Sequence, residues 1–145
     1  MRQGVGPNGW QSAIGVWQCD NMSTSFLDAA TDILGPRGLT RDADLMEPWL
    51  TDWRGRYTGR ALALASPANT QEVASLVKLC AQHRVPIVPQ GGNSGMSGGA
   101  TPDTSGEALV LSLRRMSAFR HWNEEARQVV CEAGVVLQTL HDAAG

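Results

Sequence analysis

Residues 85–100 pass from a short apolar run into a loop with five glycines, and few folds accommodate such a segment. Glycine adopts positive φ without a Cβ clash and allows close backbone approach, so clustered glycines can turn successive N–H groups toward one anion. No lysine or arginine lies between Arg84 and Arg114. The stretch predicts a phosphate-binding loop that relies on backbone dipoles and on the side chains of Asn93, Ser94 and Ser97. An ordinary flexible turn is the alternative.

Two well-known glycine-rich patterns do not describe this loop. A P-loop ends in Gly-Lys-Ser/Thr, whereas this loop closes with Gly98-Gly99-Ala100 and has no lysine to reach a terminal phosphate. The glycine positions also contain no G-x-G-x-x-G set, which excludes the dinucleotide fingerprint.

The residues before the loop predict a β-α-β unit. Residues 61–65 read as a buried strand and residues 86–89 as a second strand. Residues 70–83 read as an amphipathic helix that begins with the capping-box pair Asn69 and Glu72. Such a unit is expected to be parallel with a right-handed crossover. The glycines then follow the carboxyl end of a strand, where open α/β sheets bind ligands. His83, at the end of the helix, is expected to be a surface residue and not a catalytic one.

The segments nearer the N-terminus predict one helix and one irregular connection. Ser25 is the expected N-cap of an amphipathic helix that Gly35-Pro36 ends. Residues 37–60 carry many charges among tryptophans and a tyrosine and are predicted to be an irregular connection. Aromatic and arginine side chains can bind single-stranded nucleic acid, but the acidic residues among them disfavour that function here.

After the loop, a mostly apolar strand is predicted at residues 108–113. A hairpin at 119–122 and 129–132 and a strand-to-helix junction at 132–140 are expected to follow it. Arg114 and Arg115 end the predicted strand. They are expected to be solvated, with a phosphate contact or a contact to another part of the protein as the alternative.

Composition excludes several classes of protein. The 145 residues are 42% apolar, which suits about one domain, and the net charge of −2 disfavours nucleic acid and anionic membranes as partners. Three cysteines without a C-x-x-C pair indicate neither a disulfide framework nor a zinc site. They are expected to be reduced in a cytoplasmic protein. No apolar run approaches the roughly 18 residues that a membrane span needs.

The first 24 residues are expected to be a disordered or wrongly assigned extension. The first 21 residues have neither the continuous apolar core of a signal peptide nor the arginine-rich pattern of a transit peptide. Met22 stands directly before the predicted N-terminal helix and is the expected natural start.

Residues 89–100, Pro-Gln-Gly-Gly-Asn-Ser-Gly-Met-Ser-Gly-Gly-Ala, resemble the FAD-pyrophosphate loop of the vanillyl-alcohol oxidase / p-cresol methylhydroxylase superfamily. The resemblance is strongest to the D-2-hydroxyacid dehydrogenase branch. Asp52-Trp53-Arg54-Gly55 and Tyr57-x-Gly59 resemble the start of the flavin domain in that branch, and residues 132–135 its next strand-to-helix junction. The similarity spans roughly residues 25–145.

The resemblance implies an α+β fold, the first subdomain of a PCMH-type FAD-binding domain, with a β-α-β unit, further strands and a truncated second subdomain. It divides the chain into the extension (1–24), an N-terminal helix and connection (25–56) and an incomplete FAD-binding domain (57–145). It also implies bound FAD. The implied cofactor-binding residues are Pro89, Gln90, Gly91, Gly92, Asn93, Ser94, Gly95, Met96, Ser97, Gly98, Gly99 and Ala100.

Within this set, the backbone N–H groups of residues 91–95 are the expected phosphate donors. Asn93 occupies the position at which some members attach the flavin through a histidine, so non-covalent FAD is expected. No metal site is expected. The catalytic residues of the family lie mostly in a cap domain that these residues do not include.

The implied reaction is oxidation of a D-2-hydroxy acid, such as D-lactate, D-2-hydroxyglutarate or glycolate, with transfer of electrons to an unidentified external acceptor. Two alternatives stay open. The chain is either a non-catalytic truncated remnant without tight FAD binding, or the FAD domain of another branch, such as the enolpyruvyl reductases of cell-wall precursor synthesis.

Overall fold

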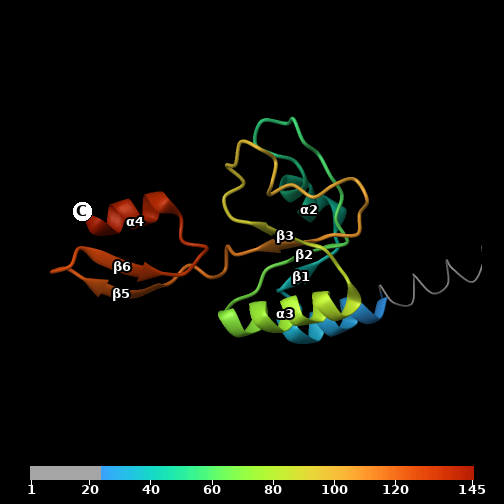
Figure 1. The fold of residues 1–145 in the computed structure, drawn as a ribbon, viewed down its shortest axis with the longest axis horizontal. Coiled ribbons are helices and arrows are strands. Elements are labelled where there is room, and N and C mark those ends of the chain that lie inside the picture. Colours follow the sequence, from blue (N-terminus) through green and yellow to red (C-terminus); the bar gives the residue numbers. More distant parts are fainter. Residues whose placement is uncertain (1–23) are drawn as a thin grey trace, which may run out of the picture.

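The computed structural model describes residues 24–145, which form an α/β layer and a smaller hairpin-and-helix unit beside it (Figure 1). The expected extension over residues 1–24 and the expected start at Met22 lie, except for residue 24, outside the described residues. Thr24 is already helical.

The larger part contains a four-stranded sheet with the order β1-β2-β4-β3. These strands are β1 (Leu39–Thr40), β2 (Ala63–Ala65), β3 (Ile87–Gln90) and β4 (Leu109–Ser112). β2, β4 and β3 are parallel, and β1 pairs antiparallel with β2. The predicted β-α-β strands are therefore present and parallel, but β4 lies between them. All four residues of β4 are buried, as expected for the centre of a parallel sheet.

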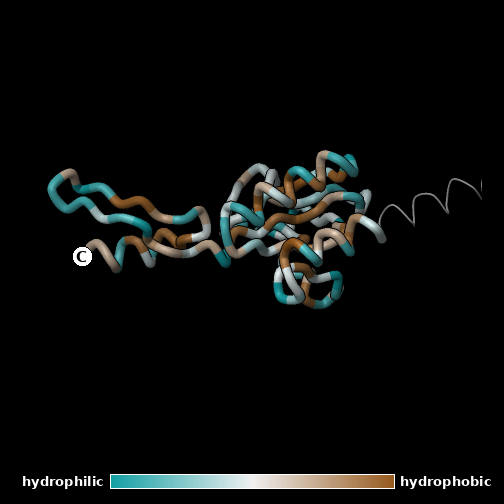
Figure 2. The backbone as a smooth tube through the Cα atoms, turned by 90° about the horizontal axis from the view of Figure 1, so that it is seen from below, coloured by the Kyte–Doolittle hydropathy of each residue, from teal (hydrophilic) through white to brown (hydrophobic). Residues whose placement is uncertain are grey.

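Helices cover both faces of this sheet (Figure 1). On one face, α3 (Thr70–His83) and the helix over residues 24–34 enclose the main core, which includes Phe26, Leu76, Ala65 and Leu109. On the other face, Met46 of α2 (Ala43–Leu50) packs with residues 64 and 110. Because side chains alternate along a strand, neighbouring residues of β2 and β4 supply the two clusters. Figure 2 shows the apolar segments running through this layer.

The N-terminal helix ends as predicted but does not begin at the predicted cap. Gly35 has a φ of 68° and its N–H donates to the Thr31 carbonyl at 2.8 Å, the arrangement of a glycine that ends a helix. Ser25, the predicted N-cap, already lies within the helix together with Thr24. The prediction was wrong because the helix reaches at least one residue further toward the N-terminus.

The bounds of α3 agree with the prediction, and its capping box is formed. Asn69 Oδ1 accepts from the Glu72 N–H at 2.9 Å, and the Glu72 carboxylate accepts from the Ala68 N–H at 2.7 Å. His83 is half-buried at the other end, with its ring 5.6 Å from that of Phe26. His83 therefore contacts the core, whereas a surface position was expected for it.

Removing the cap of α3 tests the strength of this helix end. Asn69→Ala should lower the free energy of unfolding by about 1 kcal/mol, because the N–H of Glu72 loses its acceptor. Asn69→Ser keeps an acceptor for the Glu72 N–H without adding a charge beside the Glu72 carboxylate, so it should lose less stability. Chemical denaturation of both variants measures the difference, and equal loss in both would contradict the capping role.

Residues 37–60 are more regular than predicted, because they contain β1 and α2. Asp42 caps α2, and its Oδ1 accepts from Asp44 N at 3.0 Å and Leu45 N at 3.3 Å. Pro48 lies inside this helix. A proline at that position normally predicts a break, since it removes a helical hydrogen bond. The cap and the burial of Met46 against the sheet outweigh that signal.

The chain after β4 forms the predicted hairpin and helix. β5 (Phe119–Asn123) pairs antiparallel with β6 (Gln128–Cys131), and α4 (Leu137–Ala144) follows. The Arg120 guanidinium and the Glu132 carboxylate form an ion pair at 2.9 Å. Large apolar side chains remain exposed in this unit, including Trp122 and Leu137, and α4 buries none of its residues.

Residues 24–145 contain no helix with the length and hydrophobicity to cross a membrane, and no cluster of three metal-ligating side chains. Cys80, which is buried, and Cys131 are free cysteines. Cys19 lies outside the described residues.

Candidate functional site

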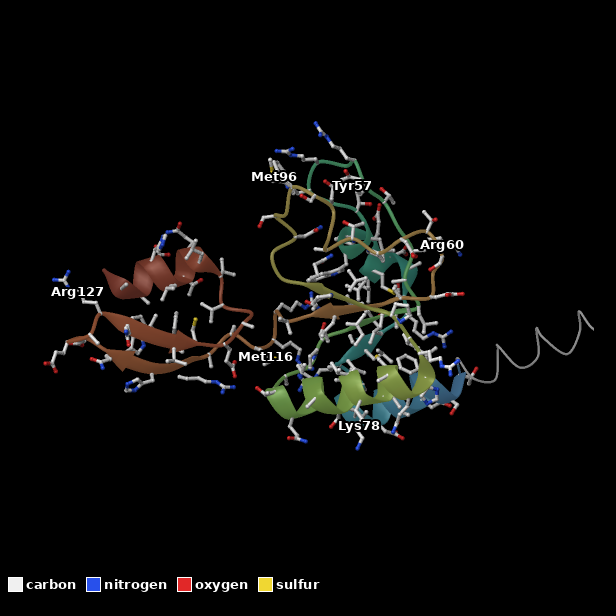
Figure 3. All side chains as sticks on the ribbon, in the orientation of Figure 1. Tyr57, Arg60, Lys78, Met96, Met116 and Arg127 are labelled. Carbon is white, nitrogen blue, oxygen red and sulfur yellow. The ribbon has the colours of Figure 1, made fainter. Side chains whose placement is uncertain are left out.

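The segment over residues 91–100, here called the glycine loop, leaves the carboxyl end of β3 as predicted (Figure 1). Pro89 lies within β3, opposite Leu111 of β4. Residues 94–97 form the exposed outer part of the loop, and Met96 and Tyr57 both lie on the upper side of the sheet in Figure 3. Among the hydrogen bonds within residues 24–145, none involves the side chains of Ser94 or Ser97. These hydroxyl groups are therefore free to meet a ligand.

Gln90 holds the two ends of the glycine loop together. Its side chain is 1% exposed, and Nε2 donates to the Ala100 carbonyl at 2.8 Å and the Trp49 carbonyl at 3.0 Å. Because both acceptors are carbonyl oxygens, the amide nitrogen must face them, and the orientation of the amide is fixed. Oε1 is left without a partner within residues 24–145. One buried side chain thus ties β3, the end of the loop and α2 to one another.

Replacing Gln90 should loosen the loop before it affects the rest of the fold. Gln90→Leu leaves two carbonyls without their donor and should cost about 1–3 kcal/mol in the free energy of unfolding. Amide exchange should rise first in residues 91–101. Gln71→Leu, on the exposed side of α3, is the matched control and should change stability by less than about 0.5 kcal/mol. Unchanged exchange in the loop of Gln90→Leu would contradict this role.

The segment over residues 51–60, here called the clamp, contacts the glycine loop at both ends of its outer part and also contacts the turn that follows the loop. Asn93 Nδ2 donates to the Thr51 carbonyl at 2.8 Å, and the Arg60 N–H donates to the Asp103 carbonyl at 2.7 Å. The Tyr57 ring lies so close to Gly98 that an added Cβ would approach its Cδ2 to 2.7 Å. Gly98 also has a φ of 71°. The fold therefore requires glycine at residue 98.

Asp52 gives the clamp its shape. Its buried carboxylate accepts from the N–H groups of Tyr57 at 2.7 Å, Arg56 at 2.7 Å and Arg54 at 3.2 Å. The Tyr57 N–H contributes most to holding the pKa of Asp52 below its ordinary value, and burial opposes this effect. An ionised Asp52 thus organises the turn that presents Tyr57 to the glycine loop.

The other glycines of the loop are not required by the fold. Gly91, Gly92, Gly95 and Gly99 do not have positive φ, and a Cβ added to any of them would meet nothing within 4 Å. Neither backbone strain nor packing explains why these positions lack side chains. The space next to them suits a ligand that approaches the backbone closely, as a phosphate does.

A cavity of about 520 Å³ opens between α2 and the glycine loop. It is here called the loop cavity, and Trp49, Gln90, Gly91, Gly92 and Asn93 contribute to its lining. Arg114, at the end of β4, also lines it, with its guanidinium carbon 4.9 Å from the centre of the Trp49 ring. Arg114 thus places a positive charge beside the glycine loop, which has no lysine or arginine of its own.

Arg114 was expected to be a solvated residue, with phosphate contact as the alternative. The side chain is exposed, but it packs over Trp49 at the mouth of the loop cavity. The pairing of Gln90 with Ser112 brings residue 114 to the end of β3 where the loop begins. The sequence signal was the arginine pair directly after the strand, but only the strand order shows that this strand neighbours β3.

The comparisons with known proteins agree with a flavin site. Residues 61–145 match the protein family described as FAD binding domain. The chain is 34% identical over 109 residues to D-2-hydroxyglutarate dehydrogenase, mitochondrial, of Arabidopsis thaliana, covering 75% of this chain and 19% of the relative. It is 40% identical to D-2-hydroxyglutarate dehydrogenase of Xanthomonas citri pv. viticola, with 72% and 22% covered.

A third relative is the quinone-dependent D-lactate dehydrogenase of Haemophilus influenzae, with 34% identity over 81% of this chain and 21% of the relative. The chain therefore spans about a fifth of the length of these curated relatives.

Among solved structures, p-cresol methylhydroxylase with bound substrate has the same fold over 85% of this chain and 24% of its own, with a TM-score of 0.74 and 21% identity. Alkyldihydroxyacetonephosphate synthase gives a TM-score of 0.70 at 21% identity, with 83% of this chain and 25% of that chain covered.

Proposed function

Because this chain belongs to the FAD binding domain family, we propose that its glycine loop holds the pyrophosphate of FAD and that the whole protein oxidises a D-2-hydroxy acid. Membership confirms the predicted family and the FAD cofactor. The likeness to p-cresol methylhydroxylase confirms the predicted α+β fold, of which the chain represents one part.

One observation carries the assignment of the pyrophosphate to the loop. Four glycines, Gly91, Gly92, Gly95 and Gly99, stand where the fold does not require glycine and where open space adjoins the backbone. A phosphate needs close approach to several N–H groups, and a side chain at these positions would prevent it. The N–H groups of residues 91–95 would donate to the phosphate oxygens. The Arg114 guanidinium would add the positive charge that the loop lacks.

The other residues of the site hold this arrangement in place. Gln90 and Asn93 use their side-chain amides to fix the loop, so neither needs to touch the cofactor to affect its binding. The Asn93 amide donates to the Thr51 carbonyl and is not a nucleophile, which supports non-covalent FAD. When bound, FAD supplies the redox chemistry, and these residues supply position and charge.

The substrate class rests on the relatives. Their names specify D-2-hydroxyglutarate and D-lactate, and from these we infer a D-2-hydroxy acid substrate, with glycolate as a further candidate. The electron acceptor stays open.

The domain bounds at residues 25–56 and 57–145 are also proposals, although the clamp crosses that boundary. We infer a cytoplasmic location from the unpaired cysteines, whereas several relatives are named as mitochondrial.

Flavin content and substrate reduction together test the proposal. The complete polypeptide that contains these residues should purify yellow, and acid precipitation should release FAD into the supernatant. D-lactate, D-2-hydroxyglutarate or glycolate should bleach the flavin absorbance, whereas L-lactate should not. Flavin retained in the pellet would contradict non-covalent binding. A flavin that none of the three acids reduces would contradict the substrate class.

The 145-residue chain, expressed alone, tests the alternative of a remnant without tight FAD binding. We expect poor solubility and weak FAD affinity, because its exposed apolar side chains favour association. A monodisperse monomer with sub-micromolar FAD affinity would contradict this expectation. Absence of flavin from the complete polypeptide would instead favour a non-catalytic remnant.

A further inference from the structure

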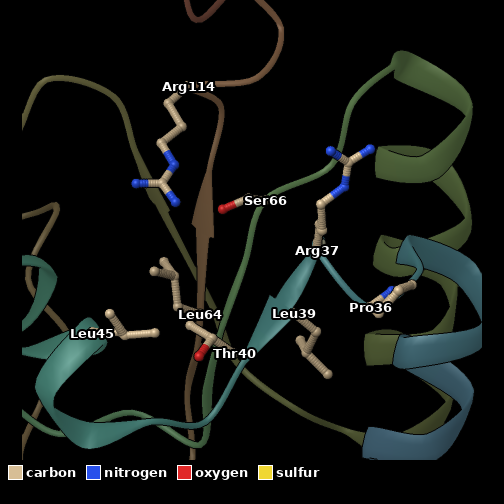
Figure 4. A pocket seen from close by; sticks show the side chains of 9 residues that line it. Pro36, Arg37, Leu39, Thr40, Leu45, Leu64, Ser66 and Arg114 are labelled. Atoms are coloured by element: carbon tan, nitrogen blue, oxygen red, sulfur yellow. The ribbon is translucent and has the colours of Figure 1, made fainter.

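We propose that a second cavity, beside the flavin loop, binds a small organic carboxylate. This cavity has a volume of about 350 Å³ and is here called the arginine cavity. Its lining includes Arg37, Thr40, Leu45, Leu64, Ser66 and Arg114 (Figure 4). It lies at the carboxyl edge of the sheet, where Ser66 follows β2, Arg114 follows β4 and Arg37 precedes the antiparallel β1. Leu45 and Arg114 also line the loop cavity.

Arg37, Ser66 and Arg114 present hydrogen-bond donors to this cavity. Within residues 24–145 neither Arg37 nor Arg114 forms an ion pair, and no aspartate or glutamate lines the cavity. Ser66 is 4% exposed, yet its hydroxyl has no hydrogen bond within the described part of the chain. Figure 4 shows this hydroxyl between the side chains of Arg37 and Arg114. A hydroxyl that lines the cavity and has no partner there can donate to a ligand bound in it.

The backbone holds Ser66 in a fixed position. Its N–H donates to the Gly38 carbonyl at 2.7 Å, and its carbonyl accepts from Arg115 Nη1 at 2.7 Å. These two bonds join the ends of β1, β2 and β4 around the cavity. The unpartnered hydroxyl therefore belongs to a preorganised edge and not to a flexible loop.

The lining also indicates the kind of anion. Guanidinium groups pair well with carboxylates. Leu39, Leu45 and Leu64 provide an apolar wall for the short aliphatic chain of such a ligand. A volume of about 350 Å³ lies at the lower end of the range for ligand pockets, which suits an acid of a few carbons better than a nucleotide. Because Arg114 borders both cavities, a carboxylate bound here would alter the charge beside the flavin loop.

Isovalerate, a branched carboxylate without a hydroxyl group to oxidise, is a suitable probe. Calorimetric titration of the complete holoprotein should show saturable binding of isovalerate and none of the neutral isoamyl alcohol. Arg37→Gln should weaken this binding at least about fivefold, and Ser66→Ala should weaken it less, because one hydrogen bond is lost instead of one charge. Arg41→Gln removes an exposed arginine that does not line the cavity, so it should leave isovalerate affinity unchanged.

Other outcomes of these titrations would contradict different parts of the proposal. Inorganic phosphate that binds as tightly as isovalerate would overturn the assignment to a carboxylate. Absence of saturable isovalerate binding, or equal weakening in Arg37→Gln and Arg41→Gln, would overturn the site itself. Flavin content, read from absorbance in the same samples, reports on the proposed function independently, because Arg37 does not line the loop cavity.

Discussion

Gly92→Val and Gly95→Val should each abolish most FAD binding while leaving the apoprotein as stable as the parent. At both positions an added Cβ has open space around it and φ is not positive, so the polypeptide accepts a side chain. The same side chain would occupy the volume that the phosphates need. If two N–H to phosphate bonds are lost at about 1.5–3 kcal/mol each, affinity should fall roughly 10²- to 10⁴-fold.

These variants are measured in the complete polypeptide. FAD titration gives the affinity, and chemical denaturation of the flavin-free protein gives the stability, which should change by less than about 0.5 kcal/mol. Gly98→Ala is the contrasting variant, because the Tyr57 ring and a positive φ oppose any Cβ there. It should lose stability by about 1 kcal/mol or more. Normal FAD affinity in Gly92→Val and Gly95→Val would overturn the assignment of the pyrophosphate to this loop.

The glycine loop could be predicted from the sequence, but the different roles of its glycines could not. The five glycines predicted the loop and its place after a strand, because both depend on local pattern. The sequence did not distinguish Gly98, which the fold needs, from Gly92 and Gly95, which it does not. That distinction depends on Tyr57, whose position is set by contacts across the fold.

Contacts between segments far apart in the sequence also explain the other differences between the predictions and the structure. The capping box at Asn69 and Glu72 is local, so α3 could be predicted closely. The strand order could not, because β2 and β4 are both buried at every residue and burial alone does not show which of them lies beside β3. The order in turn places Arg114 beside the glycine loop. In α2, Pro48 gave a local signal for a break that tertiary packing of Met46 outweighs.

The clamp extends the functional site beyond the glycines, and Asp52 is its most sensitive residue. Asp52→Ala removes the acceptor of three N–H groups, so residues 54–57 should lose their turn and Tyr57 its contact with Gly98. FAD would then bind only the fraction of molecules with an ordered loop, and the apparent affinity should fall about 10- to 100-fold. Asp142→Asn, an exposed change on α4, is the matched control and should bind FAD normally.

The pH dependence separates this charge effect from simple loss of packing. The pKa of Asp52 is lowered in the fold, chiefly by the Tyr57 N–H, so the ionised carboxylate contributes fully above its ordinary value. That contribution is lost as pH falls through the lowered pKa. The parent protein should therefore lose FAD affinity and stability more steeply below about pH 4 than Asp52→Asn does. Asp103 and Glu132, whose pKa values are also lowered, titrate in both proteins and cancel in the comparison. Identical acid profiles for parent and variant would show that the Asp52 charge does not hold the clamp.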